Sequence, residues 1–234
     1  MGSDKAKRAV VTEIQDLAPR VRCIRIAGNE LKGIDWTPGQ KVKLKIDDWS
    51  RSYTPARVDS EAGWMDIVFF LHGNGSASQW AAGVVEGERV RFNGPANSMP
   101  GPKGTPDWAL FLGDETAIGL AAALLEALPG SVNVLGAIEL DEIDSHAVEA
   151  FGLPLTAAIR TEVYGESLLH WLQSTELPDG EGMVWISGEA MSALALRQVL
   201  KSRSIERVRC KTKAYWSCKG HAHRKALEKH QLVA

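Results

Sequence analysis

Apolar and polar residues alternate in short segments through the first part of the chain, and turn residues separate these segments. A two-residue period of this kind predicts half-buried β-strands. Six strands are predicted in this way, over residues 9–14, 21–27, 41–46, 51–58, 64–71 and 88–93, with one short helix over residues 77–85. Short strands at this spacing favour a small closed antiparallel barrel.

The pattern changes after residues 94–106, which are rich in glycine and proline. Beyond them, apolar strand segments at 108–112, 132–138, 155–159, 183–187 and 208–216 alternate with helical segments at 115–128, 166–173 and 192–202. Strands that alternate with helices predict a parallel, doubly wound sheet. We therefore expect a β-barrel followed by an α/β fold, with a barrel domain over residues 1–104 and an α/β domain over residues 105–234.

Composition excludes several classes of protein. The chain of 234 residues is 44% apolar and has a net charge of −2, as expected for a globular protein. No apolar run approaches the roughly 18 residues of a membrane span, and residues 1–8 do not resemble a signal peptide. The three cysteines form no C-x-x-C pair, which argues for a reducing compartment. We expect a cytoplasmic protein, a monomer by default, without a membrane or nucleic-acid partner.

Basic residues are concentrated near the end of the chain. Residues 201–234 contain ten Lys or Arg residues against two acidic ones. This asymmetry suggests an anionic partner, although a solvated basic helix explains most of these charges equally well. The spacing of Cys218, His221 and His223 matches no common closed zinc site, so no metal site is predicted.

The segment RSYTPAR at residues 51–57 has side chains that suit a flat, anionic ligand. The guanidinium of Arg51 can fork onto a pyrophosphate, and the ring of Tyr53 can stack on a heteroaromatic face. The hydroxyl of Thr54 can hydrogen-bond to a ring nitrogen. Strand alternation would place Thr54 on the opposite face from Arg51, unless Pro55 bends the strand. An isolated motif of this kind is more often a surface strand with solvated arginines.

The segment HGNGSASQWA at residues 72–81 follows the next predicted strand. Its glycines and small residues expose backbone N–H groups at the start of a helix, which makes an anion site. Ser76 or Ser78 can cap this helix. Taken alone, the segment is an ordinary strand-to-helix turn.

Together, the two segments resemble the flavin-binding signature of the siderophore-interacting proteins. These are FAD-dependent ferric-siderophore reductases, related to the ferredoxin–NADP reductase group. Further matches follow in order over most of the chain: PGQ at 38–40, GDETA at 113–117, GEA at 188–190 and YW at 215–216. The chain departs from the family at Ser76, where proline is usual, and at Ser217 and Cys218, where arginines are usual.

The resemblance implies a role for each matching residue. Arg51 would bind the FAD phosphates, Tyr53 would stack on the isoalloxazine, and Thr54 would hydrogen-bond near flavin N5. Tyr53 and Thr54 are therefore the catalytic candidates. The other implied FAD contacts are Arg57, His72, Ala77, Ser78 and Trp80.

The second domain carries the predicted nucleotide site. Ligands bind at the carboxyl ends of strands in doubly wound sheets. The candidate residues there are Asp114, Thr116, Gly188, Glu189 and Ala190. Thr116 opens a helix whose N-terminus can hold a ribose or an amide, although simple capping by Asp114 also explains this motif. In the related reductases this loop lies against the nicotinamide.

Four acids follow the strand at residues 132–138: Glu139, Asp141, Glu142 and Asp144. Carboxylates at a strand end can accept from ribose hydroxyls and disfavour a 2′-phosphate. They favour NADH over NADPH, although a solvated acidic loop explains most of them.

The predicted function is reduction of a ferric siderophore by NAD(P)H through FAD. Four cations could steer the anionic chelate toward the flavin edge: Lys211, Lys213, Lys219 and Arg224. One alternative is a flavin reductase component that passes electrons to a protein acceptor, such as an oxygenase or an electron carrier. Another is a binding module whose basic tail docks a polyanion; such a protein would be colourless.

Overall fold

The computed structural model describes residues 6–102, 104–203 and 209–218. The chain divides into two compact units, Met1–Gly101 with Gly119–Ala127, and Pro102–Ile118 with Leu128–Ala234. Since the first unit also takes in residues 119–127, the domain limits at 104 and 105 stay a prediction. Each unit is described below by itself.

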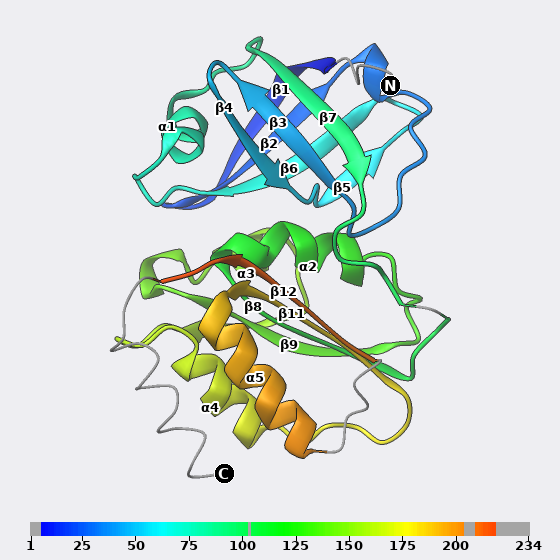
Figure 1. Cartoon of the computed structure of the whole chain (residues 1–234), viewed down its shortest axis with the longest axis vertical. Helices are drawn as coiled ribbons and strands as arrows, with labels where there is room; N and C mark the ends of the chain where they lie inside the picture. The colour runs from blue at the N-terminus through cyan, green and yellow to red at the C-terminus, as the bar shows by residue number, and fades with distance from the viewer. Residues whose placement is uncertain (1–5, 103, 204–208, 219–234) are drawn as a thin grey trace. The chain divides into compact units, whose positions relative to one another are not determined.

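The first unit is built on an antiparallel sheet of seven strands in the order β4-β3-β7-β1-β2-β6-β5 (Figure 1). Its elements are β1 (Lys7–Ala18), β2 (Val21–Ala27), η1 (Asn29–Leu31), β3 (Lys41–Ile46), β4 (Trp49–Tyr53), β5 (Arg57–Asp59), β6 (Trp64–Phe70), α1 (Ser76–Gly83) and β7 (Arg89–Ala96).

The strand predicted over residues 51–58 is two strands, which raises the expected six to seven. Pairing with neighbouring strands stops after Tyr53, where β4 ends, and resumes at Arg57, where β5 begins. Pro55 has no N–H to donate to a sheet ladder, and the three residues of the break are buried. The break therefore ends β4 directly beside Thr54.

Side chains alternate between a core face and an outer face along these strands. In β3, Val42, Leu44 and Ile46 are buried, and lysines occupy the alternate positions. Leu44 and Phe92 share one core cluster with Ile24 and Ile67, which lie on the other half of the sheet. The sheet therefore curls around a single core, as Figure 1 shows.

The second unit contains a parallel sheet of five strands in the order β10-β9-β8-β11-β12. The strands are β8 (Trp108–Asp114), β9 (Asn133–Leu140), β10 (Thr156–Ile159), β11 (Gly182–Glu189) and β12 (Cys210–Trp216). An antiparallel domain followed by a parallel α/β domain confirms the predicted fold class. The strand order reverses between β8 and β11, which is the position where doubly wound sheets bind ligands.

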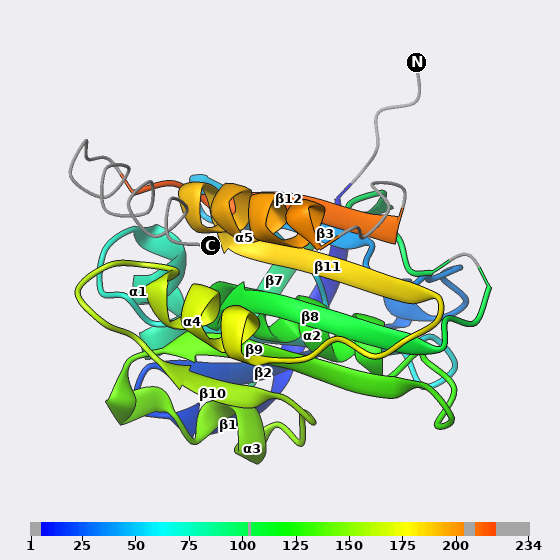
Figure 2. The ribbon, with the colours of Figure 1, turned by 90° about the horizontal axis from the view of Figure 1, so that it is seen from below.

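Helical segments follow most of these strands along the chain: η2 (Glu115–Ala117), α2 (Ile118–Leu125), η3 (Glu142–Asp144), α3 (Ala147–Ala150), α4 (Glu166–Ser174) and α5 (Ala190–Ser202). Of these, α2 belongs to the first unit from Gly119 onward. Figure 2 shows α4 and α5 side by side, and their leucines share a core with β8 and β11. Every residue of β8 and β11 is buried, as is usual for parallel strands covered on both faces. Among the described residues, no helix has both the length and the apolar character to cross a membrane.

The packing of β9 against β8 gives a test of the parallel sheet. Gly136 has φ 147°, and a Cβ there would lie 2.1 Å from the carbonyl oxygen of Phe111. We expect Gly136→Ala to lower the free energy of unfolding by about 2–4 kcal/mol, from backbone strain and overpacking. Thermal unfolding followed by calorimetry measures the change. Gly130→Ala is the matched control, because nothing lies within 4 Å of a Cβ there. Equal loss in both variants would contradict this packing.

Candidate functional site

Arg51 lies on the core-facing side of an edge strand. Across the β3–β4 ladder it is opposite Leu44, and Tyr53 is opposite Val42; both partners are buried. Arg51 is nevertheless exposed, and among the described residues its guanidinium has no carboxylate partner; it donates only to the Ser50 carbonyl oxygen, at 3.0 Å. A charged side chain in this position is available for an anionic ligand beside the core aromatics.

Tyr53 is half-buried, and its ring centroid lies 4.5 Å from that of Phe69. Burial raises the pKa of Tyr53 to about 12, so the phenol stays protonated. Thr54 follows directly and is 8% exposed. Three predicted flavin residues therefore lie together where β4 ends.

Trp80 of α1 extends this aromatic group. Its ring centroid is 5.6 Å from Phe69 and 6.1 Å from Trp49. Its indole N–H donates to the carboxylate of Glu88. Trp80 therefore fixes α1 against the sheet, and its indole N–H already has an acceptor within the protein.

The loop before α1 holds its own shape through short-range hydrogen bonds. The N–H of Gly73 donates to Ser78 Oγ at 3.1 Å, and the N–H of Asn74 donates to His72 Nδ1 at 3.3 Å. The N-cap residue is Gly75, with φ 88° and no side-chain cap, so the capping predicted for Ser76 or Ser78 is wrong. Since no side chain caps the first turn, its N–H groups suit an anion.

Arg22 fixes the other end of α1, and sequence reasoning missed it. Its Nη1 donates to the carbonyl oxygens of Ala81 and Ala82 at 2.9 and 3.0 Å. Its Nε donates to Asp16 at 2.6 Å. A cation at the last carbonyls of a helix also matches the helix dipole. Nothing in the sequence around Arg22 signals this contact between residues about 60 positions apart.

Arg57 has an acid partner within the first unit. Its Nε and Nη2 both donate to Glu126 Oε1, at 2.8 and 2.6 Å. This hydrogen bond is the main cause that raises the pKa of Arg57. The predicted phosphate contact of Arg57 stays a prediction, and any phosphate there competes with Glu126.

In the second unit, the carboxylate of Asp114 joins three strand ends. It accepts hydrogen bonds from the N–H of Thr116 at 3.0 Å, the N–H of Glu189 at 2.8 Å and the indole N–H of Trp216 at 2.8 Å. Burial raises the pKa of Asp114, while these hydrogen bonds and the Thr116 hydroxyl lower it. Capping of the η2 turn by Asp114 is thus present in the structure.

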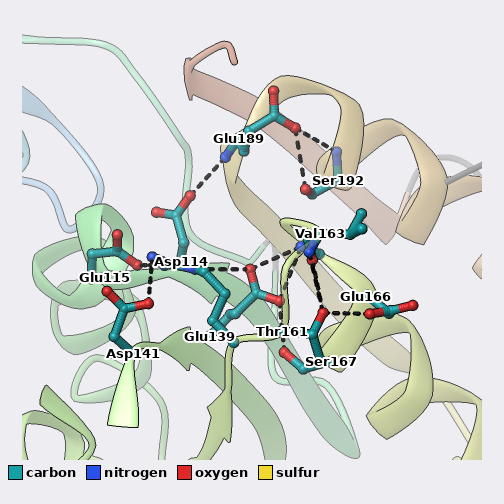
Figure 3. Close-up of polar contacts among 12 residues, drawn as sticks. Asp114, Glu115, Glu139, Asp141, Thr161, Val163, Glu166, Ser167, Glu189 and Ser192 are labelled. Carbon is teal, nitrogen blue, oxygen red and sulfur yellow. Dashed lines mark hydrogen bonds and ion pairs between the residues drawn. The ribbon is translucent and has the colours of Figure 1, made fainter. Parts of the chain in front are cut away.

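Glu189 at the end of β11 caps α5 (Figure 3). Its Oε2 accepts from the N–H groups of Met191 and Ser192 at 2.7 and 2.8 Å, and its Oε1 accepts from Cys218 N–H at 3.0 Å. The preceding Gly188 has φ 123°, and a Cβ there would lie 2.4 Å from the Asp114 carboxylate. The residues predicted to bind the nucleotide therefore lie together. Their polar groups already form hydrogen bonds within the protein.

Arg160, which sequence reasoning also missed, directly follows β10 among buried acids. Its guanidinium contacts the carboxylate of Glu115 and lies 3.2 Å from Asp141 and 3.6 Å from Glu139. It also lies 4.8 Å from the ring centroid of Tyr164. Burial works to lower the pKa of Arg160, but the neighbouring carboxylates, Glu115 first, raise it overall. The acids at 139–141 are the sequence signal that a buried cation lies nearby.

Glu139 serves the fold and is 1% exposed. Its carboxylate accepts from the N–H of Gly165 at 2.8 Å and from Ser167 Oγ at 2.6 Å, at the start of α4 (Figure 3). Asp144 is also 1% exposed. The acids expected to face a ribose are therefore partly internal, and Glu139 and Asp144 give no support to a preference for NADH.

Two of the four predicted chelate-binding cations lie on β12. Cys210 packs against the core beneath α5, so strand alternation directs Lys211 and Lys213 to the opposite face of the sheet. Both are half-exposed. The other two, Lys219 and Arg224, lie outside the described residues, as do His221 and His223.

Two family models match the chain. The siderophore-interacting FAD-binding domain matches residues 47–99, and the siderophore-interacting protein model matches residues 106–219. The first match contains the β4 and α1 residues described above. The second contains the carboxyl ends of all five parallel strands.

Similar proteins include named reductases. The ferric vibriobactin reductase of Vibrio cholerae is 26% identical over 174 residues, which are 71% of this chain and 64% of that protein. The NADPH-dependent ferric-chelate reductase of Escherichia coli is 25% identical over 195 residues, which are 80% of this chain and 72% of that protein. Mycobacterial relatives are 32% identical, over 62% of this chain, and the match spans 55% of their length.

Solved structures extend the likeness over nearly the whole chain. A siderophore utilization protein from T. fusca is 27% identical, with a TM-score of 0.76. The match covers 92% of this chain and 94% of that chain.

The buried acids predict a pH dependence of stability. Burial and the charge of Asp114 raise the pKa of Glu115 from 4.5 to about 7, although Arg160 lowers it. The folded protein therefore keeps this proton to a higher pH than the unfolded chain does, so stability falls as pH rises from about 4.5 to about 7. The shift corresponds to about 3 kcal/mol.

We expect Glu115→Gln to remove that part of the fall, because the amide keeps the shape and cannot ionise. Urea unfolding at several pH values measures it. Asp114 and Glu139, whose pKa values burial also raises, contribute to the slope that remains. An unchanged pH slope in Glu115→Gln would show that this carboxyl does not titrate as assigned.

Proposed function

Because the chain belongs to the siderophore-interacting protein family, we propose that it is an FAD-dependent ferric-siderophore reductase. In this reaction NAD(P)H gives a hydride to FAD, and single electrons then reduce chelated Fe(III) to Fe(II). Fe(III) is a hard ion that prefers oxygen donors. The chelate holds Fe(II) more weakly, so reduction releases the iron. The reductases of Vibrio cholerae and Escherichia coli support this assignment by their similarity.

The observation that carries the proposal is the exposed guanidinium of Arg51 beside the half-buried ring of Tyr53 at the end of β4. A cation without a carboxylate partner suits the FAD pyrophosphate, and an aromatic ring at the edge of a core suits a flat ring system. Thr54 follows with a hydroxyl at the same strand end. The uncapped first turn of α1 offers further N–H donors for a phosphate.

The flavin, when bound, supplies the conversion from two-electron to one-electron chemistry, and the protein supplies binding and orientation. Tyr53 would orient the ring system and stay uncharged, since burial raises its pKa to about 12. No acid–base pair among side chains is needed for this reaction. We place NAD(P)H at the reversal of strand order between β8 and β11.

The proposed function is tested by anaerobic spectroscopy of the purified protein. NADPH or NADH should bleach the visible flavin absorbance. Addition of a ferric catecholate or hydroxamate siderophore should restore it, with Fe(II) trapped by a ferrous-specific dye. A flavin that is reduced but not reoxidised by any chelate would argue for a protein acceptor instead. A colourless protein that binds no added FAD would contradict the flavoenzyme assignment.

Arg51 gives a sharper test of the flavin site. We expect Arg51→Ala to raise the Kd for FAD about 10- to 100-fold, because hydrogen bonds to charged groups contribute about 1.5–3 kcal/mol. Quenching of flavin fluorescence on binding measures the Kd. Arg51→Lys should lie between the two, since the ammonium keeps the charge but loses the fork.

Lys32→Ala is the matched control, because Lys32 is an exposed cation of the same unit outside the site. It should leave the Kd for FAD unchanged. Equal effects of Arg51→Ala and Lys32→Ala would rule out a specific phosphate contact at Arg51.

A further inference from the structure

The outer face of the antiparallel sheet carries a group of cations that the proposed function does not use. Strand alternation directs them away from the core, since their neighbours Ala9, Leu44 and Phe92 are buried. Four of the five are exposed and one is half-exposed. We call this group the basic face; its members are Arg8, Lys43, Lys45, Arg89 and Arg91.

Three of these cations form one row across three neighbouring strands. Lys45 of β3 is directly opposite Arg91 of β7, which is directly opposite Arg8 of β1. Lys43 lies two residues along the same face, and Arg89 lies opposite Val10. At a spacing of about 4.8 Å between strands, the row spans about 10 Å.

No acid neutralises this face from within its own strands. β3 and β7 contain no Asp or Glu, and the first acid of β1 is Glu13. Within the described ranges, none of the five side chains forms an ion pair with a carboxylate. Glu30 contacts the backbone at this face, where its carboxylate accepts from the N–H of Arg8.

Like charges placed directly opposite one another destabilise a sheet. If this face only contacted water, opposite charges at these cross-strand positions would stabilise the strands better than the five cations do. The row therefore indicates a ligand that supplies the missing negative charge. The net charge of the whole chain is −2, so this positive face is a local feature and not a general excess.

We propose that the basic face docks the protein reversibly on an anionic phospholipid surface. Clusters of four to eight basic residues beside a membrane segment or on an amphipathic helix attract acidic lipids electrostatically, and the basic face has five such residues. Such adsorption needs no membrane-spanning segment, but it departs from the expectation, drawn from the sequence, that the protein has no membrane partner. The proposal uses residues of the first unit only and stands independently of the proposed reductase activity.

An acidic protein is the other possible class of partner, and the makeup of the face argues against it. Stable protein interfaces have an apolar or aromatic centre that is shielded from water. Here the only large exposed apolar side chain on the described part of this face is Val10, at 37% exposure. The neighbouring outward residues, Ser50, Ser52 and Asn93, are polar. A flat array of charges suits lipid head groups better than a protein partner.

The test is co-sedimentation of the full chain with vesicles. Mixed phosphatidylglycerol–phosphatidylcholine vesicles should bind it, and pure phosphatidylcholine vesicles should not. Binding should weaken as salt rises, because the Debye length falls from about 10 Å at 0.1 M to about 3 Å at 1 M. Each basic side chain near an anionic surface contributes roughly a fivefold factor. Lys43→Glu with Arg91→Glu should therefore lower the partition coefficient by at least about 25-fold.

Lys32→Glu with Lys201→Glu is the matched control, since it changes the net charge equally at exposed positions that are not members of the basic face. It should keep most of the binding. Equal loss in both double variants, or no preference of the parent for anionic vesicles, would overturn the proposal. In the latter case an acidic protein becomes the occupant to test.

Thermal stability separates docking from unfolding. Arg91→Glu places a carboxylate opposite both Lys45 and Arg8, so the melting temperature should rise by about 1–3 °C while vesicle binding falls. A melting temperature that falls together with binding would mean that the cations serve the fold, and would count against the proposal.

Discussion

The carboxylate of Asp114 is the interaction on which the carboxyl ends of the parallel strands depend. Its oxygens accept from the starts or ends of three elements: the η2 turn after β8, the end of β11 and the end of β12. A buried carboxylate is costly unless its oxygens are hydrogen-bonded, so these strand ends must stay in register to satisfy it. The absence of a side chain at Gly188 follows directly, because a Cβ would displace this carboxylate.

Arg160 compensates the buried carboxylates on the other side of β8. One guanidinium faces the carboxylates of Glu115, Glu139 and Asp141. Removal of one partner from such a cluster leaves an uncompensated buried charge, which costs more than the pair contributes. Most polar groups at this edge of the sheet therefore form hydrogen bonds or ion pairs with one another. A nucleotide bound there has to rely on backbone groups and shape more than on these carboxylates.

The features of the fold that depend on local sequence pattern were predicted from the sequence. Two-residue alternation found the antiparallel strands, and alternation of strands with helices found the parallel sheet. Pro55 marked the bend that splits one expected strand into β4 and β5. The contacts of Arg22 and Arg160 could not be found in this way, because each joins residues far apart in the chain. The expected cap of α1 is wrong for a local reason, since Gly75 is the N-cap residue and Ser78 Oγ accepts from the N–H of Gly73.

Charged side chains are paired at the strand ends of the second unit, whereas two groups of cations in the first unit are not. In the second unit, acids and one cation are buried together, and the described carboxylates at the strand ends have donors. In the first unit, Arg51 and the cations of the basic face are left without carboxylate partners within the described residues. Neutralising them would be simple, since a glutamate opposite Arg91 would stabilise the sheet. The two proposed ligands, FAD at the end of β4 and anionic lipid on the outer face, would supply the negative charge that these cations lack.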